Sequence, residues 1–237
     1  WQYSIRAGKK EIEGEFICIP CSPSNHGPVK TSGMHFEYAD GTRFLPFGTT
    51  CYAWTYPQGN IRWQTLQSLQ VAPFNKVRMC LFPKSMIYNE EMPSQYPLLR
   101  DDEGLWDMDQ PDPEFWKDFE NQIQRLDDLG IEADVILFHP YDCWGFAKLT
   151  REESLKYLEY CIRRLSPYKN VWWSLGNEYD LMAGKTEEDW EVFAEKILRE
   201  DVYGHLMSIH HCLKSYPLKP WMTHFSVQTK STGIALS

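Results

Sequence analysis

From residue 43 onward, short apolar runs alternate with longer amphipathic stretches. The runs Val135–Phe138 and Val171–Trp173 are continuously apolar, which is typical of strands covered on both faces. Six runs have the composition of strands: residues 44–51, 75–82, 133–139, 171–177, 205–210 and 221–227. The alternation predicts βα units around a parallel sheet, and therefore an α/β fold.

The stretches between these runs carry helix start and stop signals. Asp112 as N-cap and Pro113 at the first helical position predict a helix that ends at Gly130. Two further helices are predicted to begin with capping-box patterns, at residues 150–153 and 186–189. Apolar residues recur at helical spacing in all three, so each helix has a face that can pack against the sheet.

The chain lacks the glycine-rich loops of nucleotide-binding sheets. No GxGxxG or GxxxxGK[ST] pattern follows a predicted strand, which favours a barrel over a doubly wound sheet. Residues 43–237 are predicted to form an incomplete (β/α)8 TIM barrel, because 195 residues with six strands fall short of the ~250 of a typical barrel. Residues 1–42 have strand composition and a turn cluster without a helix, and are interpreted as the tail of an N-terminal β-sandwich domain with a linker.

Charge and cysteine content narrow the possible partners. The formal charge of −9, with no run of lysine or arginine, argues against nucleic acid as a partner. No apolar run reaches the ~18 residues needed to span a bilayer, so we expect no membrane partner. The seven cysteines are odd in number and dispersed, which favours a reducing compartment, and we expect the protein to be cytoplasmic.

Polar and aromatic side chains follow the predicted strands. In a parallel barrel the carboxyl ends of the strands share one mouth, where catalytic residues gather. The residues at these ends are Tyr52 and Trp54, Arg78, His139 and Tyr141, Asn177 and Glu178, His210, and Gln228, with Trp144 in a following loop. A carboxylate, amides, imidazoles and aromatic rings together suit a sugar, whose hydroxyls need planar hydrogen-bonding partners and whose C–H face stacks on rings.

The Asn177–Glu178 pair resembles the acid/base signature of the retaining glycoside hydrolases of clan A. Further segments, in the same order along the chain, are similar to the apiosidase-like hydrolases, which carry an immunoglobulin-like domain ahead of a (β/α)8 barrel. These segments are residues 25–29 (NHGPV), 36–54 (FEYADGTRFLPFGTTCYAW), 77–79 (VRM), 82–84 (FPK) and 139–141 (HPY). The resemblance covers nearly the whole chain.

This resemblance implies hydrolysis of a β-linked glycan, of plant origin, without a cofactor. It implies that Glu178 is the general acid/base and that Asn177 binds the sugar 2-hydroxyl. The residues expected to bind substrate are Trp54, Arg78, His139, Tyr141, Trp144, His210 and Gln228. The nucleophile of the clan is a second glutamate after strand seven, so we expect it beyond Ser237, and we expect the chain by itself to be an inactive fragment.

Other interpretations remain open at this point. A non-catalytic carbohydrate-binding protein on a decayed barrel would keep the aromatic mouth, and an inverting glycosidase would hold its carboxylates ~6.5–9.5 Å apart. Arg78 could instead be a structural ion-pair partner. A metal-dependent hydrolase is disfavoured, because the first predicted strand lacks an HxH motif. The segment from Pro83 to Pro111, with Tyr88, Tyr96 and Trp106, is either a substrate-binding lid or a loop packed on the barrel.

Overall fold

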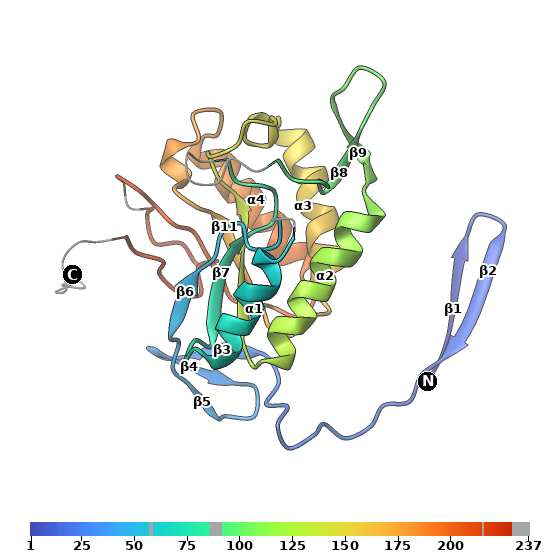
Figure 1. The fold of residues 1–237 in the computed structure, drawn as a ribbon, viewed down its shortest axis with the longest axis vertical. Coiled ribbons are helices and arrows are strands. Elements are labelled where there is room, and N and C mark those ends of the chain that lie inside the picture. Colours follow the sequence, from blue (N-terminus) through green and yellow to red (C-terminus); the bar gives the residue numbers. More distant parts are fainter. Residues whose placement is uncertain (57–58, 86–91, 215, 229–237) are drawn as a thin grey trace.

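The computed structural model describes residues 1–56, 59–85, 92–214 and 216–228. Its centre is a five-stranded parallel sheet of order β12-β11-β10-β7-β6 (Figure 1). The strands are β6 (Gly48–Thr50), β7 (Lys76–Cys80), β10 (Glu132–Phe138), β11 (Val171–Gly176) and β12 (Met207–Ser208). Every residue of β10 and β11 is buried, as their continuous apolar character predicts.

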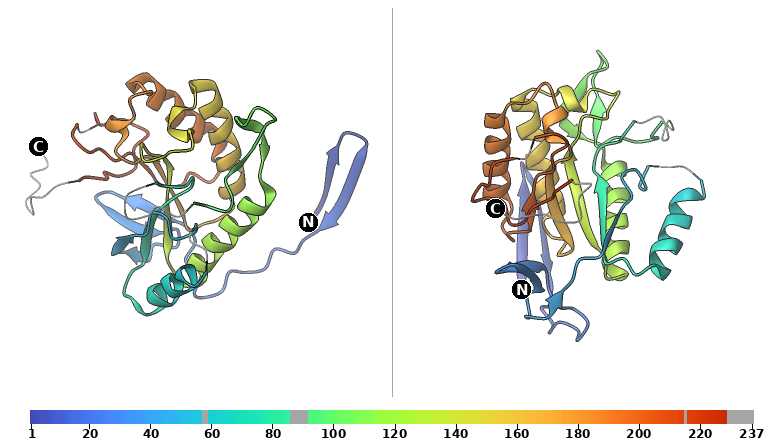
Figure 2. Two further views of the ribbon diagram at one scale, coloured as in Figure 1. Left: turned by 45° about the horizontal axis from the view of Figure 1, so that its top comes forward. Right: turned by 90° about the vertical axis from the view of Figure 1, so that its left-hand side faces the viewer.

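Four helices pack along the sheet (Figure 2), namely α1 (Ile61–Val71), α2 (Pro113–Asp128), α3 (Arg151–Leu165) and α4 (Glu187–Glu200). Three helix starts are confirmed by their caps. The Asp112 side chain accepts hydrogen bonds from two first-turn N–H groups of α2, and complete capping boxes open α3 and α4 at Thr150 and Thr186. Helix α1 begins after Asn60, whose side chain makes no capping hydrogen bond.

Three predicted strands differ from the observed ones. The run 44–51 is divided, because Phe44 pairs in an antiparallel sheet whereas residues 48–50 form β6. The run 205–210 contributes only the two residues of β12. The run 221–227 forms no strand and joins the sheet through an isolated parallel bridge between His210 and Ser226. Within the described ranges the sheet therefore does not close into a barrel.

A small antiparallel sheet covers the end at which the parallel strands begin. It consists of β3 (Val29–Ser32), β4 (His35–Tyr38) and β5 (Arg43–Phe44). Val29 and Phe44 form a buried apolar cluster with Trp172 and Leu206, which lie at the starts of β11 and β12. The rings of Phe36 and Phe44 lie 5.2 and 5.9 Å from that of Trp172. This antiparallel sheet does not cover the opposite end, where the parallel strands end and where the candidate site lies.

Two hairpins project from this body. Strands β1 (Gln2–Ala7) and β2 (Lys10–Glu15) form an exposed hairpin that lies apart from the rest (Figure 1). Strands β8 (Leu98–Arg100) and β9 (Trp106–Pro111) form another within the long segment predicted as a lid or packed loop. Tyr96 packs against Trp106 there, with 5.1 Å between ring centroids, whereas Tyr88 lies outside the described residues. The described part of this segment thus packs on the domain.

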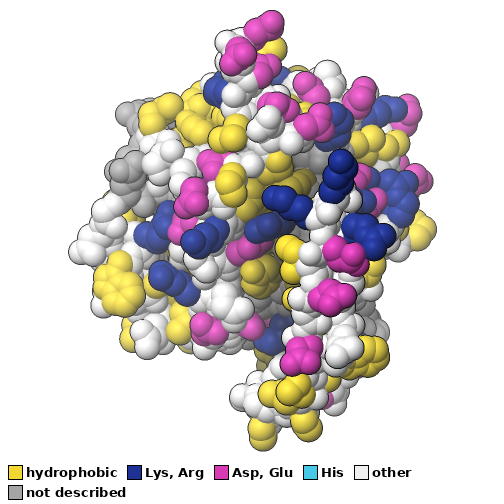
Figure 3. All heavy atoms as spheres, turned by 90° about the vertical axis from the view of Figure 1, so that its right-hand side faces the viewer, with side chains coloured by type: hydrophobic (Ala, Val, Ile, Leu, Met, Phe, Trp, Pro, Cys, Tyr) yellow, Lys and Arg dark blue, Asp and Glu magenta, His cyan; other side chains and the backbone are white. Residues whose placement is uncertain are grey.

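The molecular surface carries charges of both signs. Acidic and basic side chains are interspersed on the face that includes α2 and the two hairpins (Figure 3). No helix among the described residues is long and apolar enough to cross a bilayer.

A buried glutamate lies at the start of β10, close to the antiparallel sheet. The Trp172 indole Nε1–H donates to Glu132 Oε2 over 2.9 Å, and Glu132 is 5% exposed. Burial raises the pKa of Glu132 to about 7, because the carboxylate loses its hydration, while the Trp172 hydrogen bond opposes the rise. This side chain makes the stability of the domain depend on pH.

We expect the free energy of unfolding to decrease as pH rises from about 4.5 to 7. A group with a raised folded-state pKa contributes stability below its unfolded pKa and loses it as pH rises through the folded one. Glu132→Gln stays neutral and should remove up to about 3 kcal/mol of this decrease, whereas the exposed Glu195→Gln should not. Urea unfolding across this pH range measures the effect. An unchanged pH dependence in Glu132→Gln would contradict the assignment.

Candidate active site

The turn after β11 places an amide and a carboxylate side by side at the carboxyl end of the sheet. Gly176 ends the strand, where a Cβ atom would lie only 3.1 Å from the Trp190 ring of α4. Glu178 then adopts the left-handed conformation, with φ 51° and ψ 50°, and is the only non-glycine residue with positive φ in the described part of the chain. A short 3₁₀ helix, η2 (Tyr179–Leu181), follows at once.

The Asn177 side chain is fixed by a residue of β7 and a residue of the loop after β6. It is 2% exposed, and its Oδ1 accepts hydrogen bonds from Arg78 Nη2 at 3.2 Å and from the Tyr52 hydroxyl at 3.4 Å. Its backbone N–H donates to the carbonyl of Phe138, the last residue of β10, over 2.8 Å. Because Oδ1 accepts both side-chain bonds, the amide orientation is set and Nδ2 can donate to a ligand.

Arg78 lies in the interior of the sheet and joins several strands. Its guanidinium donates to Ser174 Oγ at 2.9 Å and to Ser226 Oγ at 3.0 Å, in addition to Asn177. It also lies 3.5 Å from Asp134 Oδ2. The structural ion pair and the contact with the site are therefore both present, so the two interpretations of Arg78 do not exclude each other.

The Glu178 carboxylate accepts a hydrogen bond from a tyrosine of the preceding βα loop. The Tyr141 hydroxyl donates to Glu178 Oε2. Burial raises the pKa of Tyr141, and the hydrogen bond and negative charge of Glu178 raise it further. Tyr141 therefore remains a neutral donor throughout the physiological pH range.

His210 and Gln228 lie together on the far side of Arg78. His210 Nδ1 lies 3.1 Å from both Ser226 O and Oγ, and Nε2 lies 3.0 Å from Gln228 Oε1. Burial lowers the pKa of His210, as does the nearby positive charge of Arg78. A neutral imidazole at this position can hydrogen-bond a sugar hydroxyl without adding charge.

Two residues predicted to bind substrate lie in the core instead. His139 is fully buried, with Nε2 3.2 Å from the Phe82 carbonyl and its ring 4.1 Å from that of Phe82. Trp54 is 4% exposed and its Nε1 lies 3.4 Å from Met79 Sδ. Both side chains are thus buried in the described structure rather than exposed at the carboxyl end, and their contact with substrate stays a prediction.

Trp144 occupies an intermediate position. Its ring is half-buried and packs edge-on against Tyr96, with 5.8 Å between centroids. Its carbonyl accepts a hydrogen bond from Trp106 Nε1 over 2.8 Å. Part of this aromatic cluster thus faces solvent near the loop that carries Tyr141.

Two aspartates that the sequence did not single out hold the loops of the site. Asp142 accepts hydrogen bonds from the N–H groups of residues 144, 145 and 147, at 2.6 to 2.9 Å. Asp180 accepts from those of residues 212, 213 and 214, at 2.7 to 2.8 Å. Asp142 comes directly after Tyr141, and Asp180 comes two residues after Glu178. An aspartate just past a strand end is a sequence signal for such a turn.

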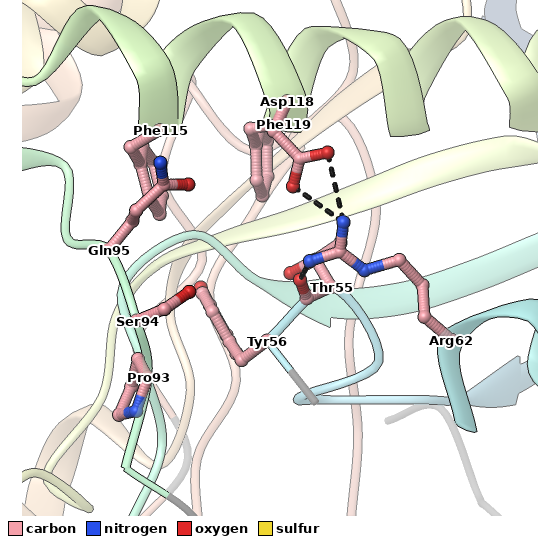
Figure 4. Close-up of a pocket in the computed structure, with 9 residues that line it drawn as sticks. All are labelled: Thr55, Tyr56, Arg62, Pro93, Ser94, Gln95, Phe115, Asp118 and Phe119. Atoms are coloured by element: carbon pink, nitrogen blue, oxygen red, sulfur yellow. Dashed lines mark hydrogen bonds and ion pairs between the residues drawn. The ribbon is translucent and has the colours of Figure 1, made fainter. Parts of the chain in front are cut away.

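A separate small cavity lies between the loop after β6 and α2 (Figure 4). Arg62 donates to both carboxylate oxygens of Asp118 at its edge, at 2.9 and 2.7 Å. The cavity has a volume of about 20 Å³, which is enough for about one water molecule. Thr55 Oγ1 and Arg62 Nε are buried there without a partner in the described structure, and a water could satisfy them. This cavity is too small for a sugar.

The described residues contain no group of three or more His, Cys, Asp or Glu side chains arranged to hold a metal ion. The groups assembled at the carboxyl end are hydrogen-bonding and aromatic, and Glu178 adds a carboxylate to them.

The parallel sheet with these groups at its carboxyl end has the architecture of the (β/α)-type glycoside hydrolases. The chain belongs to the apiosidase-like family: the family model described as "Apiosidase-like, catalytic domain" matches residues 30–233. A comparison with curated protein sequences finds no match.

Solved structures agree with this assignment. A crystal structure from Bacteroides vulgatus ATCC 8482, whose name assigns it provisionally to the glycoside hydrolases, is 43% identical with a TM-score of 0.86, covering 92% of this chain and 45% of its own. A family 5 glycoside hydrolase from the same organism is 19% identical with a TM-score of 0.59, covering 80% of this chain and 40% of its own. The endo-1,4-β-mannanase of Rhizomucor miehei is 15% identical with a TM-score of 0.55, covering 77% and 60%. The last two show the fold alone, and the chain spans less than half the length of the first.

We expect Trp54→Ala to lower the free energy of unfolding by about 3–5 kcal/mol, since it removes a buried indole and leaves a cavity. The matched control is Trp63→Ala, because Trp63 on α1 is 55% exposed, and its loss should change stability by about 0.5 kcal/mol or less. Urea unfolding of both variants measures the difference. Equal stability losses would contradict the placement of Trp54 in the core.

Proposed function

We propose that the complete protein is a retaining glycoside hydrolase that cleaves a β-linked glycan of plant origin, with Glu178 as general acid/base. The observation that carries the proposal is the Asn177–Glu178 pair at the end of β11, with its amide oriented by Arg78 and its carboxylate by Tyr141. The family assignment and the position of the pair at a strand end support it.

The geometry divides two tasks between neighbouring residues. Tyr141 donates to Glu178 Oε2, so the proton of the neutral acid belongs on Oε1, from which it can pass to the leaving glycosidic oxygen. The carboxylate left behind is stabilised by the same tyrosine and can then take a proton from water in the second step. Asn177, with Oδ1 already engaged, presents Nδ2 as a donor to the sugar 2-hydroxyl.

The retaining mechanism also needs a nucleophilic carboxylate ~5–5.5 Å from Glu178. The resemblance to clan A assigns this role to a glutamate after a seventh strand of the barrel. Activity is therefore a property to be measured on the complete protein.

We expect Glu178→Gln in the complete protein to lower kcat/KM by about 10²–10⁴-fold for glycosides with poor leaving groups, because only these need protonation. Activated aryl glycosides should keep kcat/KM within about tenfold. Azide should restore turnover of the variant and give a glycosyl azide of retained configuration, since it attacks the covalent intermediate without base assistance. The exposed Glu195→Gln serves as the matched control and should behave as wild type.

Each alternative has its own outcome in these assays. Equal losses on both substrate types would contradict the acid/base role of Glu178. A first product of inverted configuration would identify an inverting enzyme. Saturable binding of oligosaccharides without turnover would identify a non-catalytic carbohydrate-binding protein.

A further inference from the structure

A buried lysine lies between the two tyrosines of the site. Lys84 is 5% exposed, and its Nζ lies 3.8 Å from the ring centroid of Tyr52 and 4.3 Å from that of Tyr141. An ammonium group over an aromatic face is attracted by the negative face of the ring, most strongly where both are desolvated. One cation therefore holds two rings that come from different βα loops.

The hydroxyls of these same two tyrosines reach the catalytic pair. Tyr52 donates to Asn177 Oδ1 and Tyr141 donates to Glu178 Oε2. The backbone adds a second tie, because the N–H of Ser85 donates to the Tyr141 carbonyl over 2.9 Å. A displacement of Lys84 would therefore shift both tyrosines, and through their hydroxyls it would affect both Asn177 and Glu178.

We propose that Lys84 is a positioning residue for the acid/base, holding Tyr52 and Tyr141 in place and supplying a fixed positive charge beside Glu178. This inference rests on the proposed function of Glu178. Lys84 acts through the tyrosines and through its charge, and its burial keeps it from being a substrate contact.

The charge of Lys84 has a definite effect on Glu178. Burial lowers the pKa of Lys84, whereas the Cys80 thiol and the Glu178 carboxylate nearby act to raise it. The attraction is mutual, so the Lys84 cation and the Glu178 carboxylate stabilise each other. Among the described residues, the titratable or charged groups that act on this cluster include Tyr52, Tyr141, Arg78, Cys80, His139 and Cys212.

Removing the cation should therefore disturb both the charge and the geometry of the site. In Lys84→Met we expect the alkaline limb of the pH profile of kcat/KM to move up by about 0.5–1 pH unit, because a positive charge beside the site is lost. We also expect kcat/KM for poor leaving groups to fall about 10–100-fold at the optimum, as the tyrosines lose their support. Lys84→Arg keeps the charge and should recover the wild-type limb position.

The matched control is Lys185→Met. Lys185 is also partly desolvated and lies over an aromatic ring, 6.0 Å from the centroid of Phe193, and its Nζ donates to the Leu149 carbonyl. Its loss should leave the alkaline limb in place. If Lys84→Met does not fold, Lys84→Gln removes the same charge and provides the same comparison.

A second measurement separates this inference from the proposed function. The carboxyl ¹³C shift of Glu178, titrated in the complete wild-type protein and in Lys84→Met, reports ionisation without turnover. A titration curve that differs between the two proteins supports the role of Lys84 even if no glycoside is hydrolysed, in which case the proposed function alone fails. An unchanged Glu178 titration and alkaline limb, with only a lower melting temperature, would make Lys84 a structural residue and overturn the inference.

Discussion

The site depends on the hydrogen bonds and the ion pair that the Arg78 guanidinium makes. The guanidinium lies inside the parallel sheet, where it contacts Asp134 on β10, Ser174 and Asn177 at β11 and Ser226 beside β12. A buried cation is stable only when its donors and its charge are both satisfied, so these strands are held in one relative position. Loss of this side chain would leave Asp134 with Lys76 as its remaining close cation.

Asn177 and Glu178, the proposed catalytic pair, are held by different parts of the fold. Asn177 is fixed from within the sheet, whose pairing is rigid and buried. Glu178 is held by Tyr141, which lies in a loop shaped by the neighbouring Asp142. Changes in the loops can therefore alter the acid/base while the amide stays in place, which is a route by which one sheet can serve different glycans.

Local signals predicted much of the fold. The strands β7, β10 and β11 and the starts of three helices followed from apolar runs and caps, which act within a few residues. The apolar runs did not predict the edge of the sheet, because a two-residue strand such as β12 depends on its neighbours rather than on its own composition. The contacts of Arg78 with Asn177 and of Tyr141 with Glu178 join residues that the sequence places at strand ends. The burial of His139 and Trp54 depends on side-chain direction, which spacing alone does not give.

The left-handed backbone at Glu178 has a consequence for how such a domain can change over time. That conformation costs an L-residue with a Cβ about 1–2 kcal/mol, whereas glycine adopts it freely. The fold therefore bears a conformational cost at the position of the proposed acid. If that role holds, glycine at position 178 would relieve this backbone cost and lose the carboxylate, so we expect selection for catalysis to retain the glutamate.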